Sequence, residues 1–309
     1  MRAVVTGGAG FIGSNIAAAL CRRGGDVVVL DDLSSGFAQN LDGYPEVRLV
    51  KGSVLDSDLV DSVVKGADVV FHHAASVGNK RSIDEPRSDA MTNVLGAVNV
   101  LEACRHGGVR KLVYASSAGI FGELKELPIS ESHPVEPDSP YGASKLAAEK
   151  ECLAYAKLYD LEAIALRYFN VYGPNQRFDA YGNVIPIFVF GLIRGEGITI
   201  FGDGEQTRDF INVGDVVQAN LKAAASQGVS GAFNLGSGTR ISINGLVRQL
   251  ASTIRGMPHV THGPPRPGDV RDSLADISKA RTAFGFEPEV SLASGLAEYV
   301  AWARSEVDD

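Results

Sequence analysis

The sequence contains little cysteine. Three cysteines, Cys21, Cys104 and Cys152, occur among 309 residues, and each lies in an apolar stretch with helical spacing. Three is an odd number, and the intervals between them do not match those of zinc ligands. The cysteines therefore predict neither a disulfide framework nor a metal site, and we expect reduced thiols in the core.

Positive charge is also scarce. There are 29 Lys and Arg residues against 37 Asp and Glu residues, which gives a net charge of -8. An acidic protein repels phosphate backbones and anionic lipid headgroups, so we expect no nucleic-acid partner. A small anionic ligand such as a nucleotide is still allowed, because Arg side chains and helix N-termini act at contact distance.

Long apolar runs are missing as well. Nowhere do 18 apolar residues follow one another. The first residues, MRAVVTGG, have the pattern of a strand and a turn rather than of a signal sequence. We therefore expect a cytoplasmic protein that does not associate with membranes.

Short segments rich in Val, Ile and Leu recur through the first half of the chain. They cover residues 3–5, 27–30, 47–50, 69–71, 111–115 and 164–167. Apolar and polar residues hardly alternate in them, which is typical of strands buried on both faces of a parallel sheet. Helical periodicity between them, as over residues 11–23 and 92–106, supplies the crossovers that such a sheet needs. The pattern predicts an α/β fold with a doubly wound, Rossmann-like parallel sheet.

The pattern changes after Tyr172. Glycine and proline become frequent, for example at Gly173, Pro174 and Gly182, which indicates shorter elements and longer loops. We predict two domains, residues 1–172 and residues 173–309, of which the second is a smaller α/β domain. The sequence GAFNLG at 231–236 again has strand character, so a segment near 210–240 is expected to return to the first domain.

A glycine-rich turn follows the first predicted strand. Gly7, Gly10 and Gly13 precede a helical pattern over residues 14–20. Glycines with this spacing allow a tight turn, close approach of backbone N–H groups to a pyrophosphate, and close helix packing. The next strand ends at Asp31 and Asp32, about 20 residues further on, where a carboxylate can accept both ribose hydroxyls and repels a 2'-phosphate. The sequence therefore predicts a site for NAD rather than NADP.

A second predicted helix carries a tyrosine and a lysine four residues apart. Tyr141 and Lys145 lie on one helix face, where a nearby ammonium can lower the pKa of a phenol. Taken alone this spacing is common, but a strand upstream ends at Ser116 and Ser117, and ligands of open α/β sheets bind at such strand ends. We predict that Tyr141 moves the proton of a hydroxyl while hydride moves to or from NAD, with Ser117 bound to the same hydroxyl. Ser116 is more simply a turn-capping residue.

The glycine turn, Asp31, Ser117 and the Tyr141/Lys145 pair together resemble the extended short-chain dehydrogenase/reductase family. Across nearly the whole chain the sequence is most similar to the UDP-glucose 4-epimerases and their close relatives. The stretches that carry this resemblance are TGGAGFIGSN, HHAAS, SSAGIFG, SPYGASK, RYFNVYGPNQR, GDGEQTRDFINV and RPGD.

The resemblance implies an NAD-binding domain at 1–172, a nucleotide-sugar-binding domain at 173–309, and the catalytic residues Tyr141, Lys145 and Ser117. The implied cofactor-binding residues are Gly7, Gly10, Phe11, Ile12, Gly13, Asp31, Asp32, Ser53, Val54, Ala74, Ala75, Ser76, Asn93, Tyr141, Lys145 and Tyr168. The implied substrate-binding residues are Ser82, Ser117, Tyr141, Asn170, Arg177, Val184, Ile185, Thr199, Phe201, Arg208, Arg266 and Asp269.

Five positions bear on which members of the family this sequence resembles most. Dehydratases of the family carry an acidic pair where this sequence has Ala118 and Gly119, which argues against elimination. Ser273 stands where relatives carry a bulky residue, which favours a roomy sugar site. Arg177 resembles the arginine that uronic-acid epimerases place against the sugar carboxylate, whereas Asn170 stands in place of their threonine.

These observations favour an NAD-dependent UDP-sugar 4-epimerase that retains its NAD tightly and works through a transient 4-keto sugar. The sequence favours the pair UDP-glucose and UDP-galactose and the pair UDP-glucuronate and UDP-galacturonate almost equally as substrates. A 4-ketosugar reductase and a non-catalytic nucleotide-sensing protein are the alternatives. By resemblance we also expect a homodimer, in which the helices at about 92–106 and 141–158 pair with their copies.

Overall fold

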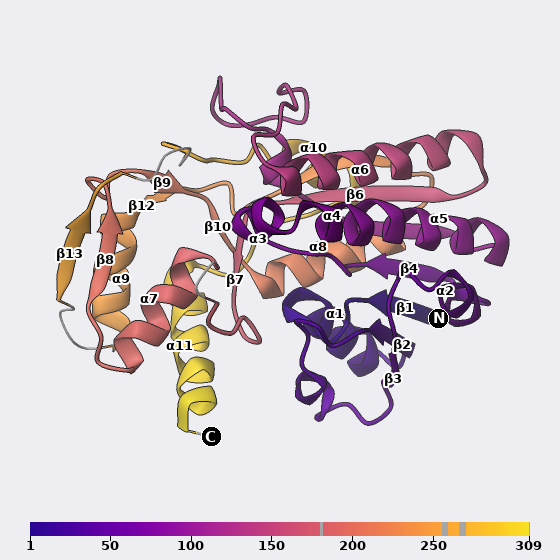
Figure 1. Cartoon of the computed structure of the whole chain (residues 1–309), viewed down its shortest axis with the longest axis horizontal. Helices are drawn as coiled ribbons and strands as arrows, with labels where there is room; N and C mark the ends of the chain where they lie inside the picture. The colour runs from indigo at the N-terminus through magenta and orange to yellow at the C-terminus, as the bar shows by residue number, and fades with distance from the viewer. Residues whose placement is uncertain (180–181, 255–258, 266–269, 309) are drawn as a thin grey trace.

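A seven-stranded parallel sheet forms the larger of two lobes in the computed structural model, which describes residues 1–179, 182–254, 259–265 and 270–308 (Figure 1). The strand order is β11-β6-β5-β4-β1-β2-β3, and every neighbouring pair is parallel. The strands are β1 (Arg2–Thr6), β2 (Asp26–Asp31), β3 (Arg48–Lys51), β4 (Val69–His72), β5 (Lys111–Ser117), β6 (Glu162–Tyr168) and β11 (Gly231–Leu235). The predicted α/β fold with a Rossmann-like parallel sheet is confirmed.

Helices cover both faces of this sheet. The helices that pack against the sheet are α1 (Phe11–Arg22), α2 (Ser57–Val64), α5 (Gly96–Gly107), α6 (Pro140–Leu158), α8 (Val213–Ala225) and α10 (Ser278–Phe284). Val5 packs with residues of α1 and α8 on one face, and the preceding Val4 packs with residues of α2, α5 and α6 on the other. Successive strand side chains point to opposite faces, so two covered faces explain the unalternating apolar pattern.

The sheet reverses its winding between β1 and β4. From β1 the chain adds β2 and β3 on one side, and then returns to add β4, β5 and β6 on the other. Connections leave the carboxyl ends of β1 and β4 in opposite directions, which opens a crevice where ligands of such folds bind. The glycine turn follows β1 at this point.

The smaller lobe consists of helices and two-stranded sheets (left in Figure 1). The strand pairs are β7 (Asn170–Tyr172) with β10 (Phe210–Asn212), β8 (Ile198–Phe201) with β13 (Val260–Gly263), and β9 (Thr207–Arg208) with β12 (Ile241–Ser242). Its helices are α7 (Val184–Ile193), α9 (Ile243–Ile254) and α11 (Leu292–Asp308). Between β10 and β12 the chain re-enters the larger lobe as α8 and β11.

The predicted helix over residues 92–106 is divided in the structure. A π-helical turn, η2 (Met91–Leu95), precedes α5, and the short helices α3 (Asn79–Asp84) and α4 (Pro86–Ala90) lead into it. Two further short helices are η1 (Ala38–Leu41) and η3 (Ala118–Ile120). A π-helical turn often marks a functional position, and this one carries the buried Asn93. In the part of the chain described here, no helix has the length and apolarity needed to cross a membrane.

Candidate active site

The glycine turn is shaped by contacts that exclude side chains. Gly7 has φ +66°, and a Cβ added there would lie 2.5 Å from the backbone nitrogen of Ala74. A Cβ at Gly13 would overlap the carbonyl oxygen of Gly7. α1 begins at Phe11, with Gly10 as its N-cap, so Phe11 and Ile12 form the first turn of the helix. A bare helix N-terminus after a tight turn is suited to a phosphate group, and this cradle fits the pyrophosphate of a dinucleotide.

Asp31 closes the other side of the turn. Its Oδ2 accepts a hydrogen bond from the N–H of Ala9 at 2.9 Å, and its Oδ1 accepts one from Leu33 at 2.9 Å. The residue is 7% exposed, and burial raises the pKa of its carboxyl. Asp32 is exposed, and its Oδ1 accepts from Ser34 N–H. The structure thus brings the end of β2 against the glycine turn, where a carboxylate can face a ribose.

Asn93 joins the segment after β4 to the helix α6. Its Oδ1 accepts from Ser76 N–H at 2.8 Å, and its Nδ2 lies 3.0 Å from both Ser76 O and Ser144 Oγ. The hydroxyl of Ser144 also donates to the carbonyl of Tyr141 at 3.0 Å. Ala74 and Ala75 lie on the same half-buried segment. A continuous row of contacts therefore connects the glycine turn, through this segment, to the start of α6.

The other expected cofactor residues occupy two places. Ser53 Oγ accepts from Leu55 N–H at 3.2 Å, and Val54 is buried beneath α5. The hydroxyl of Tyr168 lies 2.9 Å from Nε2 of His73. Burial, reinforced by the charge of Lys145, lowers the pKa of His73 to about 3, so this ring is neutral. The sequence interpretation missed His73, although the motif HHAAS contains it.

Tyr141, Lys145 and Ser117 come together at the end of β5. α6 starts at Pro140 with Ser139 as its N-cap, which places Tyr141 in the first turn. Lys145 is 3% exposed, and its Nζ donates to the carbonyl of Ala115 at 2.9 Å. Ser117 Oγ accepts from Gly119 N–H at 3.1 Å, and its hydroxyl lies near enough to the Tyr141 phenol to lower the pKa of that phenol. A phenol, an ammonium and a second hydroxyl therefore surround one strand end.

Burial dominates the protonation of this group. It raises the pKa of Tyr141 to about 12, while the neighbouring Ser117 side chain acts in the opposite direction. It also lowers the pKa of Lys145 to about 8, and the nearby carboxylate of Asp89 opposes that change. The sequence predicted that the ammonium lowers the pKa of the phenol. In the structure the pKa of the phenol is raised instead, and the loss of hydration on burial is the largest cause.

Residues expected to bind substrate converge from the smaller lobe. Asn170 N–H and Nδ2 both donate to the carbonyl of Asp209, next to Arg208 on β9. The Asp209 carboxylate is fully buried and accepts from Ser237 and Ala275 N–H groups, which ties this lobe to the end of β11. The sequence interpretation missed Asp209, because the groups that donate hydrogen bonds to it are distant in the sequence.

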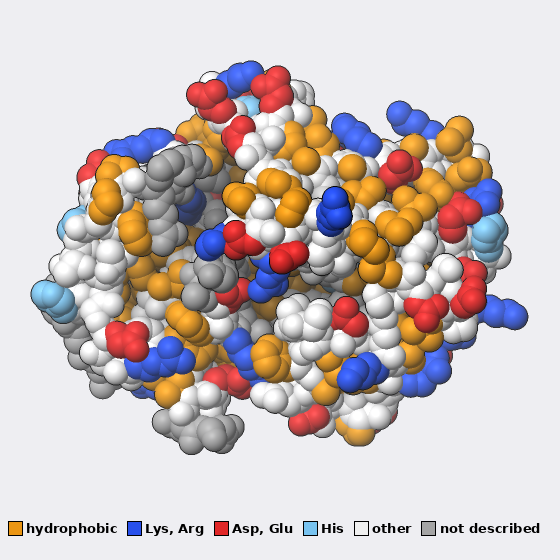
Figure 2. All heavy atoms as spheres, in the orientation of Figure 1, with side chains coloured by type: hydrophobic (Ala, Val, Ile, Leu, Met, Phe, Trp, Pro, Cys, Tyr) orange, Lys and Arg blue, Asp and Glu red, His pale blue; other side chains and the backbone are white. Residues whose placement is uncertain are grey.

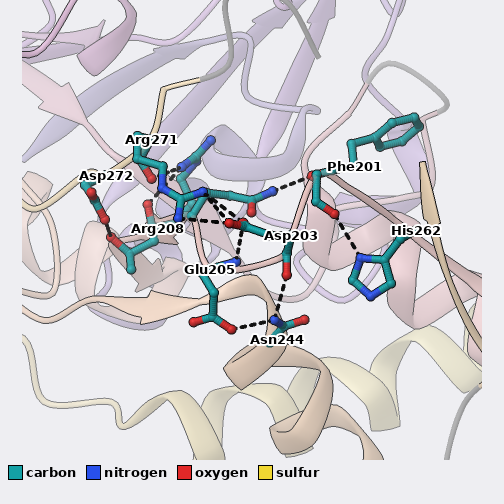
Figure 3. A network of polar contacts seen from close by, with 11 residues as sticks. Phe201, Asp203, Glu205, Arg208, Asn244, His262, Arg271 and Asp272 are labelled. Carbon is teal, nitrogen blue, oxygen red and sulfur yellow. Dashed lines mark hydrogen bonds and ion pairs between the residues drawn. The ribbon is translucent and has the colours of Figure 1, made fainter. Parts of the chain in front are cut away.

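A polar network surrounds Arg208 (Figure 3). Arg271 forms an ion pair with Asp203 at 2.8 Å, and the ring of Phe201 points away from the network. Thr199 Oγ1 lies 3.1 Å from Thr261 Oγ1 on β13. In Figure 2 the surface is hollowed between the two lobes, with basic side chains among those that face the hollow. Two predicted residues, Arg266 and Asp269, lie outside the described residues.

The remaining predicted substrate residues do not gather at this network. Ser82 is fully buried and donates to the carbonyl of Asn79, whereas Ile185 and Val184 contribute to the core of the smaller lobe. Arg177 donates to Asn40 Oδ1 at 2.6 Å and pairs with Glu306 on α11 at 2.7 Å. Its guanidinium also covers the ring of Phe37 at 4.3 Å. Arg177 thus bridges the loop after β2 and the C-terminal helix.

Comparisons with known proteins agree with this geometry. A model described as the NAD dependent epimerase/dehydratase family matches residues 3–236. A UDP-glucose 4-epimerase of Mycolicibacterium smegmatis is 41% identical over 311 residues, which cover 99% of each chain.

Two crystal structures are also similar. One is the UDP-glucose 4-epimerase of Thermotoga maritima with UDP-glucose, which is 38% identical with a TM-score of 0.94 and covers 99% of this chain and 100% of that one. The other is the UDP-glucuronic acid 4-epimerase of Bacillus cereus with UDP-glucuronic acid and NAD, which is 30% identical with a TM-score of 0.92 and the same coverage.

Proposed function

Because this chain belongs to the NAD dependent epimerase/dehydratase family, we propose that it is an NAD-dependent UDP-sugar 4-epimerase. The observation that carries the proposal is the meeting of Tyr141, Lys145 and Ser117 at the end of β5, beside the glycine turn of β1. Such a constellation at the carboxyl edge of a doubly wound sheet can move a proton and a hydride from one alcohol.

The residues around the crevice fit NAD. Gly7, Gly10 and Gly13 leave room for a pyrophosphate at the start of α1, and Asp31 is held where it can accept from a ribose. A bound NAD would supply the hydride acceptor for the sugar carbon and the donor that restores the alcohol, and its positively charged ring would favour the phenolate of Tyr141. We propose that the protein keeps this cofactor through the whole cycle.

The side chains of this protein move the proton. The Tyr141 phenolate removes the proton of the sugar 4-hydroxyl. After the keto sugar has rotated in the site, the phenol returns the proton to the carbonyl oxygen. Lys145 stabilises the phenolate by its charge, and the hydroxyl of Ser117 holds the oxygen that gains and loses the proton. Ala118 and Gly119 carry no carboxyl group, so these two positions supply no second acid to drive elimination.

We propose a neutral hexose as the sugar, so that UDP-glucose and UDP-galactose interconvert. The support is the ion pair of Arg177 with Glu306, since a guanidinium already neutralised by a carboxylate attracts a uronate less. We further propose that Asn170, Thr199, Phe201 and Arg208 bind the nucleotide part of the substrate, and that Arg266 and Asp269 join them. Arg208 carries the charge expected for a diphosphate.

Purified protein incubated with UDP-glucose and no added NAD is expected to form UDP-galactose. Parallel incubations with UDP-galactose, UDP-glucuronate and UDP-N-acetylglucosamine, with products separated by chromatography, define the sugar. Arg177→Met is expected to leave hexose turnover intact. A need for added cofactor in stoichiometric amounts would indicate a net oxidoreductase instead, and conversion of UDP-glucuronate that is lost in Arg177→Met would overturn the choice of a neutral sugar.

We also propose that the protein is a cytoplasmic homodimer. Hydrophobic side chains gather on the surface over α5 and α6 (Figure 2). Met91 and Leu95 on η2, which leads into α5, and Leu158 at the end of α6 are exposed. Free cysteines fit a reducing compartment. Light scattering is expected to give twice the chain mass for the wild type and the chain mass for Leu95→Glu. A monomeric wild type at micromolar concentration contradicts the proposed dimer.

A further inference from the structure

A buried carboxylate on the catalytic helix contacts two strands at once. Glu149 lies four residues after Lys145 on α6 and is fully buried. Its Oε1 pairs with Arg167 Nη2 at 2.7 Å, and its Oε2 accepts from Arg167 Nε at 3.0 Å. Oε2 also accepts from the hydroxyl of Ser116 at 2.7 Å. One carboxylate therefore holds α6, β5 and β6 together.

The strand register places these contacts beside the catalytic serine. Ser116 pairs with Arg167 across β5 and β6, and the next pair is Ser117 with Tyr168. Ser116 and Ser117 share a planar peptide bond, and only two backbone dihedrals between their Cα atoms can rotate easily. Fixing Ser116 therefore restricts the backbone of Ser117. Ser116 is thus more than the turn-capping residue that the sequence suggested.

The guanidinium is fixed on its other sides as well. Arg167 is 3% exposed, and its Nη1 donates to the carbonyl of Glu131 at 3.3 Å. The guanidinium Cζ lies 5.2 Å from the ring centre of Phe121. A planar guanidinium that pairs with both oxygens of a carboxylate sets orientation as well as distance. A buried ion pair adds little net stability over apolar residues, because both charges lose their hydration.

We propose that Glu149 and Arg167 are positioning residues, which set the distance between Ser117 on β5 and Tyr141 on α6. This inference rests on the proposed epimerase function, since it assigns the pair to the same proton transfer. Glu149 and Arg167 act on Ser117 through the neighbouring Ser116 and on Tyr141 through α6. Neither side chain needs to contact the substrate.

The chain offers a matched control pair on the same two strands. Lys111 and Glu162 are paired across β5 and β6 at their opposite ends, with Nζ and Oε2 at 2.6 Å, and Lys111 is fully buried. Loss of this pair disturbs the same strands far from Ser117. If both ion pairs serve folding alone, their loss changes stability and leaves the kcat of the folded protein unchanged. Positioning predicts instead that kcat falls when the Glu149 pair is lost and stays the same when the Lys111 pair is lost.

The test compares two double variants, Glu149→Leu with Arg167→Met and Lys111→Met with Glu162→Gln. Double variants avoid the unpaired buried charge that a single substitution leaves. We expect both to fold, as circular dichroism and urea unfolding will show. The first is expected to lose kcat on the order of 10-fold to 100-fold with little change in KM, because a small displacement of a catalytic group has effects of this size. The second is expected to keep the wild-type kcat.

The pH profile supplies a readout that folding alone does not move. The nearby hydroxyl of Ser117 lowers the pKa of Tyr141, so moving Ser117 away raises that pKa. Because the phenolate is the active form, the acid limb of kcat is expected to move to higher pH in the Glu149/Arg167 variant and to stay in place in the control.

An ultraviolet titration of tyrosinate, taken as the difference from Tyr141→Phe, measures the same pKa without any assay of activity. A wild-type kcat and an unmoved titration in the Glu149/Arg167 variant overturn the inference, and so does an equal kcat loss in the control. If the wild type does not epimerise UDP-sugars, the proposed function fails, and the titration still decides whether the pair positions Ser117.

Discussion

Tyr141→Phe is expected to lower kcat by about 10²-fold to 10⁴-fold, the range typical of a lost general acid or base. The substitution removes a single hydroxyl, so the side chain keeps its shape and the NAD site keeps its walls. The retained cofactor, read from its absorbance after release by heat, is expected to match the wild type. KM for the nucleotide sugar is expected to change little, because the diphosphate and base are bound elsewhere.

The matched control is Tyr155→Phe on the same helix. That hydroxyl donates to Glu102 Oε1 at 2.6 Å, away from Ser117, so its loss costs about 1 kcal/mol of stability and leaves kcat unchanged. A folded, NAD-loaded Tyr141→Phe protein with normal turnover would show that another group moves the proton. The same outcome would remove the basis for the positioning role of Glu149 and Arg167.

Gly13→Ala is expected to abolish NAD retention. The new Cβ would overlap the carbonyl oxygen of Gly7 and lie 2.8 Å from Cα of Gly8, and both contacts are with backbone that cannot rotate away. The turn must then open, which displaces the start of α1 from the phosphate site. We expect a loss of roughly 1–3 kcal/mol in the free energy of unfolding, the usual cost of overpacking, and purified protein without bound cofactor.

Gly43→Ala is the corresponding control. A Cβ at Gly43 meets nothing within 4 Å, so this variant is expected to be neutral or slightly more stable and to keep its NAD. Urea unfolding and cofactor absorbance measure both effects. Full NAD content in Gly13→Ala would mean that the dinucleotide does not lie against this turn.

Much of the fold could be predicted because its signals are local. A strand buried on both faces has a short unalternating apolar run, and the predicted runs coincide with β1 to β6 within a residue or two. The prediction of a helix over residues 92–106 was less accurate. Its first turn is the wider η2, and helical periodicity does not distinguish a π-helical turn from an α-helical one.

The candidate site was predicted where its residues share one element. Tyr141 and Lys145 are one helical turn apart, so their sequence spacing already places them on one face. Glu149 belongs to the same face, but its partners Arg167 and Ser116 lie on two different strands, and no sequence interval links the three. Arg177 is the opposite case. The sequence suggested that it contacts a ligand, whereas in the folded chain it forms an ion pair with Glu306 on α11.

The amino-acid sequence by itself determined the α/β class, the glycine turn and the Tyr141/Lys145 spacing, because steric limits and helical period act over a few neighbouring residues. Only the tertiary structure decided the protonation of the site and the partners of its charged groups. Burial sets the pKa of Tyr141 and Lys145, and burial depends on strands and helices brought together from distant parts of the chain. Hydration and long-range pairing are properties of the packed molecule, so no local pattern contains them.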